Sequence, residues 1–263
     1  MHYKTTMKYY FRHILIFYLA LLLIGCKQQY KITNSKSVNN EINNELSTNN
    51  FLETTILPYR TELELQMNEV INTSLIDMEV GSPEGLLGNF VCDLTYLKAQ
   101  EISDKLVDFC LLNNGGLRTP LPKGEITRGK IFELMPFENE IVIVEISGDN
   151  MLQLIEYIKT KSLITKSRKA GVPVSGLRIA INNDTVSEVK IGTFAFDTKK
   201  NYRVATSDYL ANGGDQMDFF LSPISIENTG IKLRDAILTH IINLSQKDTK
   251  LDATIDGRIY YAE

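Results

Sequence analysis

The segment Asn113-Asn114-Gly115-Gly116-Leu117-Arg118 has a later counterpart in Ala211-Asn212-Gly213-Gly214-Asp215, and these two segments are the strongest constraint on the fold. Each contains a Gly-Gly pair beside polar side chains, and each follows a run of residues typical of a β-strand. Glycine allows backbone conformations that are closed to other residues, and it lets a ligand approach the chain closely. The two turns therefore predict one binding cleft built from both.

Six polar or aromatic residues in and near these turns suit a ligand that combines a planar base, a sugar diol and an anionic group. They are Asn113, Arg118, Phe137, Asn139, Tyr209 and Asp215. The guanidinium of Arg118 is a planar fork suited to phosphate or carboxylate, and Asp215 can accept two hydroxyl hydrogen bonds from a ribose. Phe137 and Tyr209 follow turn-forming residues, where two rings could hold a base between them, and stacking contributes about 1–3 kcal/mol per base.

Each of these residues also has a structural explanation. Phe137 follows Pro136 and could belong to the core, and Tyr209 could pack its ring and hydrogen-bond its hydroxyl. Arg118 could pair with a surface carboxylate, and Asp215 could cap a turn. The binding hypothesis depends on the occurrence of these residues together and in this order.

Hydrophobic periodicity predicts an irregular succession of helices and strands. The predicted helices cover residues 59–71, 86–100, 129–134 with Thr127 as N-cap, and 230–244, and a further helix begins after Ser147. The predicted strands cover residues 107–112, 141–146, 178–181, 186–191, 202–206 and 253–260, and the third and fourth of these form a hairpin. We therefore expect an α+β fold with mixed sheets rather than a doubly wound sheet.

Residues 1–25 resemble a bacterial lipoprotein signal peptide. Lys4, Lys8 and Arg12 precede an unbroken apolar run over residues 14–24, which is shorter than a bilayer span of about 20 residues. The run ends in Gly25-Cys26, so we expect cleavage before Cys26 and a lipid on its sulfur. The protein would then be anchored in the cell envelope, facing the periplasm or the cell surface. An ordinary signal peptide and an uncleaved anchor are the alternatives.

The remaining chain divides into a tether and one domain. Residues 26–50 are rich in Ser, Asn, Lys and Gln and contain few large apolar side chains, so they predict a flexible tether. Residues 51–263 are long enough to bury a sizeable core as a single domain.

The charge balance and the scarce metal ligands limit the possible functions. Removing residues 1–25 leaves 25 basic and 32 acidic residues, a net charge of −7, which argues against nucleic acid as a partner. Cys92 and Cys110 predict buried free thiols rather than a disulfide. His240 is the one histidine after the signal segment, and its apolar neighbours favour a structural role. We therefore expect no catalytic residue, metal site or cofactor in this chain.

Four motifs in order resemble the C-terminal domain of the 5′-nucleotidases, a family that includes the UDP-sugar hydrolases. They are Leu87-Gly88-Asn89-Phe90-Val91-Cys92-Asp93, the segment from Asn113 to Arg118, Met135-Pro136-Phe137-Glu138-Asn139, and the segment from Asp208 to Asp215. The resemblance covers residues 51–263 and implies a four-layer α/β/β/α arrangement that binds the nucleoside part of a substrate.

The resemblance also implies a role for each binding residue. Phe137 and Tyr209 would hold the base, Asp215 would accept from the ribose hydroxyls, and Asn113 and Arg118 would contact the ribose and phosphate side. Asn139 would reach the edge of the base, and Gly176 would line the base pocket.

The chain departs from the family pattern in three ways. Tyr209 stands where the family usually has Phe, which preserves stacking. The stretch Gly81-Ser82-Pro83-Glu84-Gly85 lacks the one or two arginines that family members carry there, which bears on phosphate affinity. We also expect this chain to lack the N-terminal metallophosphatase domain of the family, with its two metal ions.

The residues and the resemblance leave three functional hypotheses. The first is the nucleotide-recognising part of a 5′-nucleotidase-type hydrolase in nucleotide catabolism, acting with a separate metallophosphatase that carries the divalent metals. The alternative is a surface lipoprotein that binds nucleosides without turnover. The third is a structural or adhesive lipoprotein, which leaves unexplained the joint presence of five binding residues, Asn113, Arg118, Phe137, Asn139 and Asp215.

Overall fold

The computed structural model describes residues 49–164, 167 and 169–262, together with residues 12–15, 17, 34–39, 41 and 43. The chain divides into two compact units, Met1–Asn50 and Phe51–Glu263, and the second unit holds all of the strands that the structure describes. Cys26 and most of the predicted signal peptide and tether lie outside the described residues. In the part of the chain that is described, no helix has both the length and the apolar character needed to cross a membrane.

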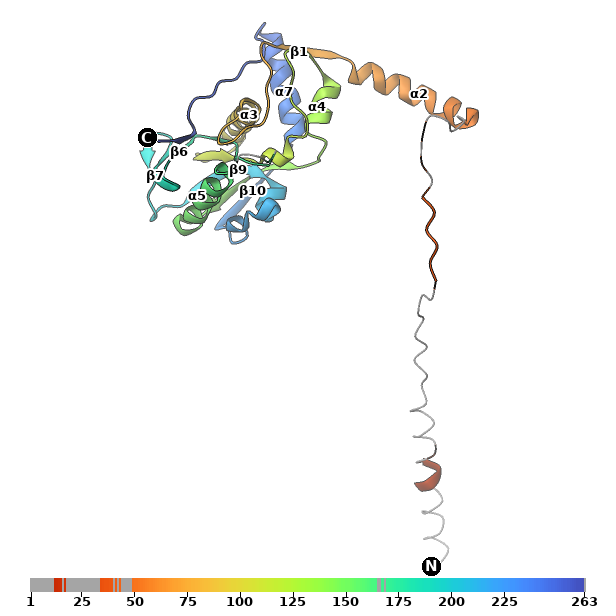
Figure 1. The fold of residues 1–263 in the computed structure, drawn as a ribbon, viewed down its shortest axis with the longest axis horizontal. Helices are drawn as coiled ribbons and strands as arrows, with labels where there is room; N and C mark the ends of the chain where they lie inside the picture. Colours follow the sequence, from red (N-terminus) through yellow and green to blue (C-terminus); the bar gives the residue numbers. More distant parts are fainter. Residues whose placement is uncertain are drawn as a thin grey trace, which may run out of the picture. The chain divides into compact units, whose positions relative to one another are not determined.

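The second unit alternates helices and strands irregularly (Figure 1). Its helices are α2 (Asn50–Met67), α3 (Leu86–Ile102), α4 (Arg128–Leu134), α5 (Gly148–Ser162), α6 (Asp208–Ala211) and α7 (Leu233–Gln246), with the 3₁₀ turns η1 (Asn114–Gly116), η2 (Gly214–Gln216) and η3 (Asp218–Phe220). Its strands are β1 (Val70–Ser74), β2 (Phe109–Leu111), β3 (Gly124–Thr127), β4 (Glu140–Ile146), β5 (Val174–Ser175), β6 (Leu177–Asn182), β7 (Thr185–Ile191), β8 (Phe194–Ala195), β9 (Tyr202–Ser207), β10 (Ser225–Lys232) and β11 (Ile259–Tyr261).

A five-stranded mixed sheet forms the centre of the fold, in the order β10-β4-β9-β2-β5. Strands β2 and β9 run parallel, with Phe109 opposite Val204, whereas the other neighbours in this sheet are antiparallel. A four-stranded sheet has the order β11-β6-β7-β8, and its β6–β7 pair is the predicted hairpin. Strands β1 and β3 form a separate two-stranded sheet.

Two hydrophobic cores cover the two faces of the five-stranded sheet. Along β4, Ile141 and Ile143 point into the first core, while Val142 and Val144 point into the second, because successive strand residues face opposite sides. Helices α3, α4 and α7 lie together over the first core (Figure 1). The second core is filled from α5 and from the four-stranded sheet. The fold is thus the mixed α+β class with mixed sheets that the sequence predicts.

The starts of α4 and α5 confirm the prediction, and both helices have the N-cap residue that the sequence indicated. The Thr127 hydroxyl accepts from the backbone N–H of Lys130 at the start of α4, and the Ser147 hydroxyl accepts from that of Asn150 at the start of α5. Such caps satisfy backbone donors that have no partner inside the helix. Helix α5 matters for the site because it carries Tyr157 and Lys161.

Several element boundaries differ from the sequence prediction, and the helix expected over residues 59–71 already begins at Asn50. The helix expected over residues 59–71 ends at Met67, because Val70 and its neighbours pair with β3. The helix expected from residue 230 begins at Leu233, because β10 extends to Lys232, which lies opposite Glu140. The closing strand is only Ile259–Tyr261. The backbone N–H groups of Asp256 and Arg258 instead donate to the Glu84 carboxylate at 2.9 Å each.

The two cysteines of the domain are buried and unbridged, which confirms the prediction of free thiols. Cys92 lies on α3 and Cys110 on β2, both against the first core. Burial raises the pKa of the Cys92 thiol, which favours its neutral form.

Candidate functional site

The pairing of three strands brings the predicted binding segments to one edge of the central sheet. Because β2 and β9 are parallel, the turns that come after them, which carry Asn113 and Asp215, lie at the same edge. Strand β4 runs antiparallel to β9 with Ile141 opposite Ser207, so the loop before β4, which carries Phe137, also lies at that edge. The amide of Asn113 donates directly to the Asp215 carboxylate.

A cavity of about 220 Å³ occupies this edge. Six of the seven residues predicted to bind the ligand line it. The complete lining is Asn113, Gly115, Gly116, Arg118, Phe137, Asn139, Lys169, Tyr209 and Asp215. We call it the first cavity.

The second Gly-Gly turn lets the Tyr209 ring pack closely against the backbone that leads to Asp215. A Cβ atom on Gly214 would lie 2.5 Å from two carbons of the Tyr209 ring, so only glycine lets the ring occupy its place. Gly213 has a φ of 83° and Asp215 a φ of 52°, both in the left-handed region. The left-handed backbone favours glycine at position 213, and the close Tyr209 ring requires it at position 214.

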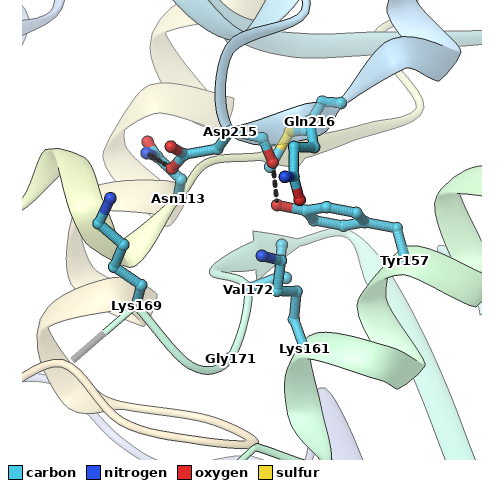
Figure 2. A pocket seen from close by; sticks show the side chains of 9 residues that line it. Asn113, Tyr157, Lys161, Lys169, Gly171, Val172, Asp215 and Gln216 are labelled. Carbon is cyan, nitrogen blue, oxygen red and sulfur yellow. Dashed lines mark hydrogen bonds between the residues drawn. The ribbon is translucent and has the colours of Figure 1, made fainter. Parts of the chain in front are cut away.

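Asp215 is held at several atoms. Its backbone N–H donates to the Tyr209 hydroxyl at 3.2 Å, and that hydroxyl donates to Asp215 Oδ1 at 3.2 Å. The Tyr157 hydroxyl donates to the Asp215 carbonyl at 2.9 Å (Figure 2). Burial, aided by the negative charge of Asp215, raises the pKa of Tyr157, so its hydroxyl stays protonated as a donor. The carboxylate is therefore fixed before any ligand arrives.

The two predicted stacking rings are exposed enough to meet a ligand. Phe137 is 39% exposed and Tyr209 is 46% exposed, and both line the first cavity. The Arg118 guanidinium carbon lies 5.9 Å from the centre of the Phe137 ring, a cation–π distance. Arg118 is itself exposed, so its charged fork is available to an anion.

The loop that carries Phe137 is fixed by charged residues from the start of α7. Arg234 donates to the Phe137 carbonyl at 3.4 Å and pairs with Glu138, which also pairs with Lys232. The hydrogen bond from Lys232, and then that from Arg234, lower the pKa of Glu138 from 4.5 to about 2. The loop thus depends on a charged carboxylate.

Asp208 joins this loop to the turn that carries Tyr209. Its Oδ1 accepts from the backbone N–H of Glu140 at 3.2 Å and from that of Tyr209 at 2.7 Å. The sequence placed Asp208 inside a motif but gave it no role. Its position explains how the two rings keep their relative placement.

Several residues at the site were missed by sequence reasoning. Asn114 is buried, and its amide donates to the carbonyls of Gly81, at 2.9 Å, and Ala170, at 2.5 Å. These two hydrogen bonds connect the loops of Gly81 and Ala170 to the first Gly-Gly turn. In the sequence, only the Asn113-Asn114 doublet indicated that Asn114 could have a role. Tyr157 and Lys169 gave no signal, because each reaches the site from a distant part of the chain.

The structure does not place Gly176 with the other predicted residues. Strand β5 runs antiparallel to β2, with Ser175 opposite Cys110, so the residue after β5 lies toward the opposite edge of the sheet from Asn113. Gly176 lines a different cavity, with Asp93 and Arg258 among its neighbours. Its φ of 80° and the 3.0 Å that a Cβ would leave to the Asp108 carbonyl explain why glycine stands there.

The site does not fit a divalent cation. Asp215 is its one carboxylate, and it shares the cavity wall with the cations of Arg118 and Lys169. Across the described ranges, no group of three His, Cys, Asp or Glu side chains is placed to hold a metal. His240 lies half-buried with its ring edge-on to Phe90 at 6.0 Å, and burial lowers its pKa.

Known proteins resemble this chain in sequence. The model of the family described as 5′-nucleotidase, C-terminal domain, matches residues 68–222. The trifunctional nucleotide phosphoesterase protein YfkN of Bacillus subtilis is 28% identical over 216 residues, which are 76% of this chain and 14% of that protein. A 5′-nucleotidase of Vibrio parahaemolyticus is 29% identical over 137 residues, which are 51% of this chain and 24% of that protein.

Solved structures share the fold. A 5′-nucleotidase precursor from Thermus thermophilus matches with a TM-score of 0.67 and 27% identity, over 80% of this chain and 43% of that one. The NAD nucleotidase of Haemophilus influenzae matches in fold, with a TM-score of 0.61 and 18% identity, over 81% of this chain and 41% of that one. The chain spans less than half of the length of each of these four relatives.

The Glu138 pairs predict a specific acid response of the free energy of unfolding. A carboxylate whose pKa is lowered by folding stabilises the folded state above its unfolded pKa, and this contribution disappears as the pH falls through the folded value. We expect Glu138→Gln to be less stable than the wild type near neutral pH, and the difference to shrink between pH 4.5 and about 2.

Urea denaturation of both proteins across this pH range measures the effect. Glu133→Gln is the matched control, since Glu133 is an exposed carboxylate on α4 with no ion pair among the described residues. A difference that stays constant down to pH 2 would contradict the role assigned to Glu138.

Proposed function

Because this chain belongs to the 5′-nucleotidase C-terminal domain family, we propose that its domain recognises nucleosides or nucleotides for a 5′-nucleotidase-type phosphohydrolase in nucleotide catabolism. The observation that carries the proposal is the first cavity, where two aromatic rings, one fixed carboxylate and one guanidinium face the same space. The two rings match the base of a nucleotide, the carboxylate matches its ribose diol, and the guanidinium matches its phosphate.

The proposed ligand lies across the first cavity. Its base stacks between Phe137 and Tyr209, and its ribose hydroxyls donate to Asp215, whose oxygens keep their bonds from Asn113 and Tyr209. A carboxylate oxygen can accept more than one hydrogen bond, so these bonds hold Asp215 without consuming it. Asn139 is proposed to reach the edge of the base, and Arg118 an anionic group of the ligand.

Hydrolysis is proposed to depend on a separate metallophosphatase polypeptide. Divalent metals in such a domain clamp the attacking and leaving oxygens of a phosphoester. The present domain would contribute by orienting the nucleoside, and positioning of this kind lowers barriers by up to about 7–11 kcal/mol. The relatives whose names include nucleotidase or phosphoesterase are much longer than the part that this chain matches.

One observation favours the alternative of nucleoside capture without turnover. The turn at residues 81–85 contains no arginine, and its Glu84 carboxylate is occupied by the backbone N–H groups of Asp256 and Arg258. This turn therefore offers no cation to a phosphate. Comparing the affinities for adenosine and AMP distinguishes the two roles.

The proposal places the domain in the cell envelope. Its basis is the sequence of residues 1–26, where a basic region and a short apolar run precede Gly25-Cys26. A lipid on Cys26 would keep the nucleoside site close to the membrane, on the periplasmic or outer side.

Loss of either ring is expected to weaken adenosine binding. Phe137→Ala and Tyr209→Ala should each raise the Kd by about 5- to 150-fold, which corresponds to a stacking contribution of about 1–3 kcal/mol. Isothermal titration calorimetry measures the change. Tyr209→Phe keeps the ring and should lose far less. Phe194→Ala, which removes a 73%-exposed ring on β8, should bind like the wild type. Equal affinities for all variants would refute base stacking here.

Catalysis in a complex is expected to depend on the same carboxylate. AMP hydrolysis should increase when this chain is co-expressed with a metallophosphatase from the same cells, and Asp215→Ala should abolish most of that increase. Phosphate release and co-purification of the two proteins are the measurements. If mixing brings no gain and no complex forms, the hydrolase proposal fails and nucleoside capture remains.

Cys26 is expected to carry the lipid. Cys26→Ser should lose incorporation of radiolabelled fatty acid and move the protein from the membrane fraction to the soluble fraction. Cys92 and Cys110 are buried in the domain, so we expect no label on them. A labelled, membrane-bound Cys26→Ser protein would contradict the anchor.

A further inference from the structure

Helix α2 (Asn50–Met67) contains no buried residue, although it is 18 residues long. Exposed apolar side chains occur along it, among them Tyr59 at 75% and Leu63 at 55%. A helix of this length is marginal in water by itself, because most helical stability in proteins comes from packing an apolar face. Pro58 inside the helix weakens it further, since proline removes a backbone hydrogen bond. The helix therefore needs a surface to pack against.

Four apolar residues of α2 follow the spacing of a coiled coil. Leu52, Ile56, Tyr59 and Leu63 are separated by four, three and four positions, which is the a/d pattern of a heptad repeat. On a helix with 3.6 residues per turn, these side chains form one stripe, which we call the α2 stripe. All four side chains are exposed. The α2 stripe is therefore suited to packing against another helix with a matching stripe.

Two copies of the α2 stripe match each other when the helices run antiparallel. Leu52 of one copy then lies opposite Leu63 of the second copy, and Ile56 lies opposite Tyr59. A two-fold axis repeats the same contacts on the other half of the pair, so each copy uses the same surface. The antiparallel pair thus covers all four stripe residues of both copies.

The charges beside the α2 stripe favour this orientation. Glu53 and Arg60 lie on the same side of the stripe, and within one chain they form an exposed ion pair at 3.1 Å. In the antiparallel pair, Glu53 of each copy lies beside Arg60 of the other, which gives two ion pairs between the copies. In a parallel pair, Arg60 would instead lie beside Thr55, because e positions then face g positions.

The charge of α2 disfavours a membrane surface as its partner. Helices that lie on membranes carry Lys and Arg on their polar face, which anionic lipids attract. Residues 50–67 instead contain three glutamates and one arginine, so anionic lipids would repel them. A second copy of α2 accommodates these charges, because its own arginine lies beside a glutamate of the first copy.

We propose that α2 is a dimerisation helix, which pairs antiparallel with α2 of a second copy of this chain. The paired helices overlap over residues 50–65, which corresponds to about 24 Å of helix. Small interfaces are typical of weak or transient association, so the dimer is reversible. The α2 helix contributes no residue to the first cavity, so the dimer carries two open copies of that cavity.

Sedimentation equilibrium of the full-length chain in density-matched detergent measures the dimer. We expect the wild type to dimerise, and Leu63→Glu to raise the dimer dissociation constant by about a hundredfold or more, because each copy replaces a leucine of the contact with a charge. Leu65→Glu is the matched control. Leu65 is 73% exposed on the same helix and lies outside the α2 stripe, so this change should alter the dissociation constant by less than about twofold.

Charge reversal tests the orientation of the two helices. Glu53→Arg places two arginines beside each other across the pair, and Arg60→Glu places two glutamates there, so each variant alone should dimerise about tenfold more weakly. An equimolar mixture of the two variants should recover dimerisation, since every arginine again lies beside a glutamate. Both variants lose the ion pair within the chain, so that pair cannot explain the recovery.

Several results would overturn the proposal. A monomeric wild type would exclude the dimer, and equal effects of Leu63→Glu and Leu65→Glu would exclude the α2 stripe as its contact. A mixture of the charge variants that does not recover dimerisation would exclude the antiparallel orientation. If the wild type is monomeric and Leu63→Glu abolishes its co-purification with a metallophosphatase, α2 belongs to that partner instead.

Discussion

The parallel pairing of β2 and β9 is the constraint on which the site depends. It places two turns that lie far apart in the sequence at the same sheet edge, where Asn113 donates to Asp215. The antiparallel strand β4 brings the Phe137 loop to that edge from the other side of β9. A change in either pairing would move a binding residue to the far edge, as the antiparallel β5 does for Gly176.

Around this frame, hydrogen bonds fix the groups that would meet a ligand. Asp208 couples the loop before β4 to the turn after β9, and Arg234 anchors the Phe137 carbonyl from the start of α7. Tyr157 and Tyr209 hold both the backbone and the carboxylate of Asp215. A site arranged before binding loses less conformational entropy when the ligand arrives, which favours affinity. The two rings stay partly exposed while their supports are fixed.

Local charge at the site opposes the charge of the whole chain. The chain has a formal net charge of −4, yet Arg118, Lys161 and Lys169 surround a single carboxylate at the sheet edge. Such an arrangement attracts a small anion while the acidic surface disfavours long polyanions. The same charges explain why the site does not fit a divalent cation.

Much of this organisation could be predicted from the sequence. Periodicity and caps located α3, α4, α5 and the β6–β7 hairpin, because those signals are local. Motif order also identified six residues of the first cavity. The tertiary structure alone decided that Gly176 lies elsewhere, that residue 70 begins a strand, and that Tyr157, Lys161 and Lys169 approach Asp215. These outcomes depend on strand direction and on contacts between distant segments, which no local pattern of residues encodes.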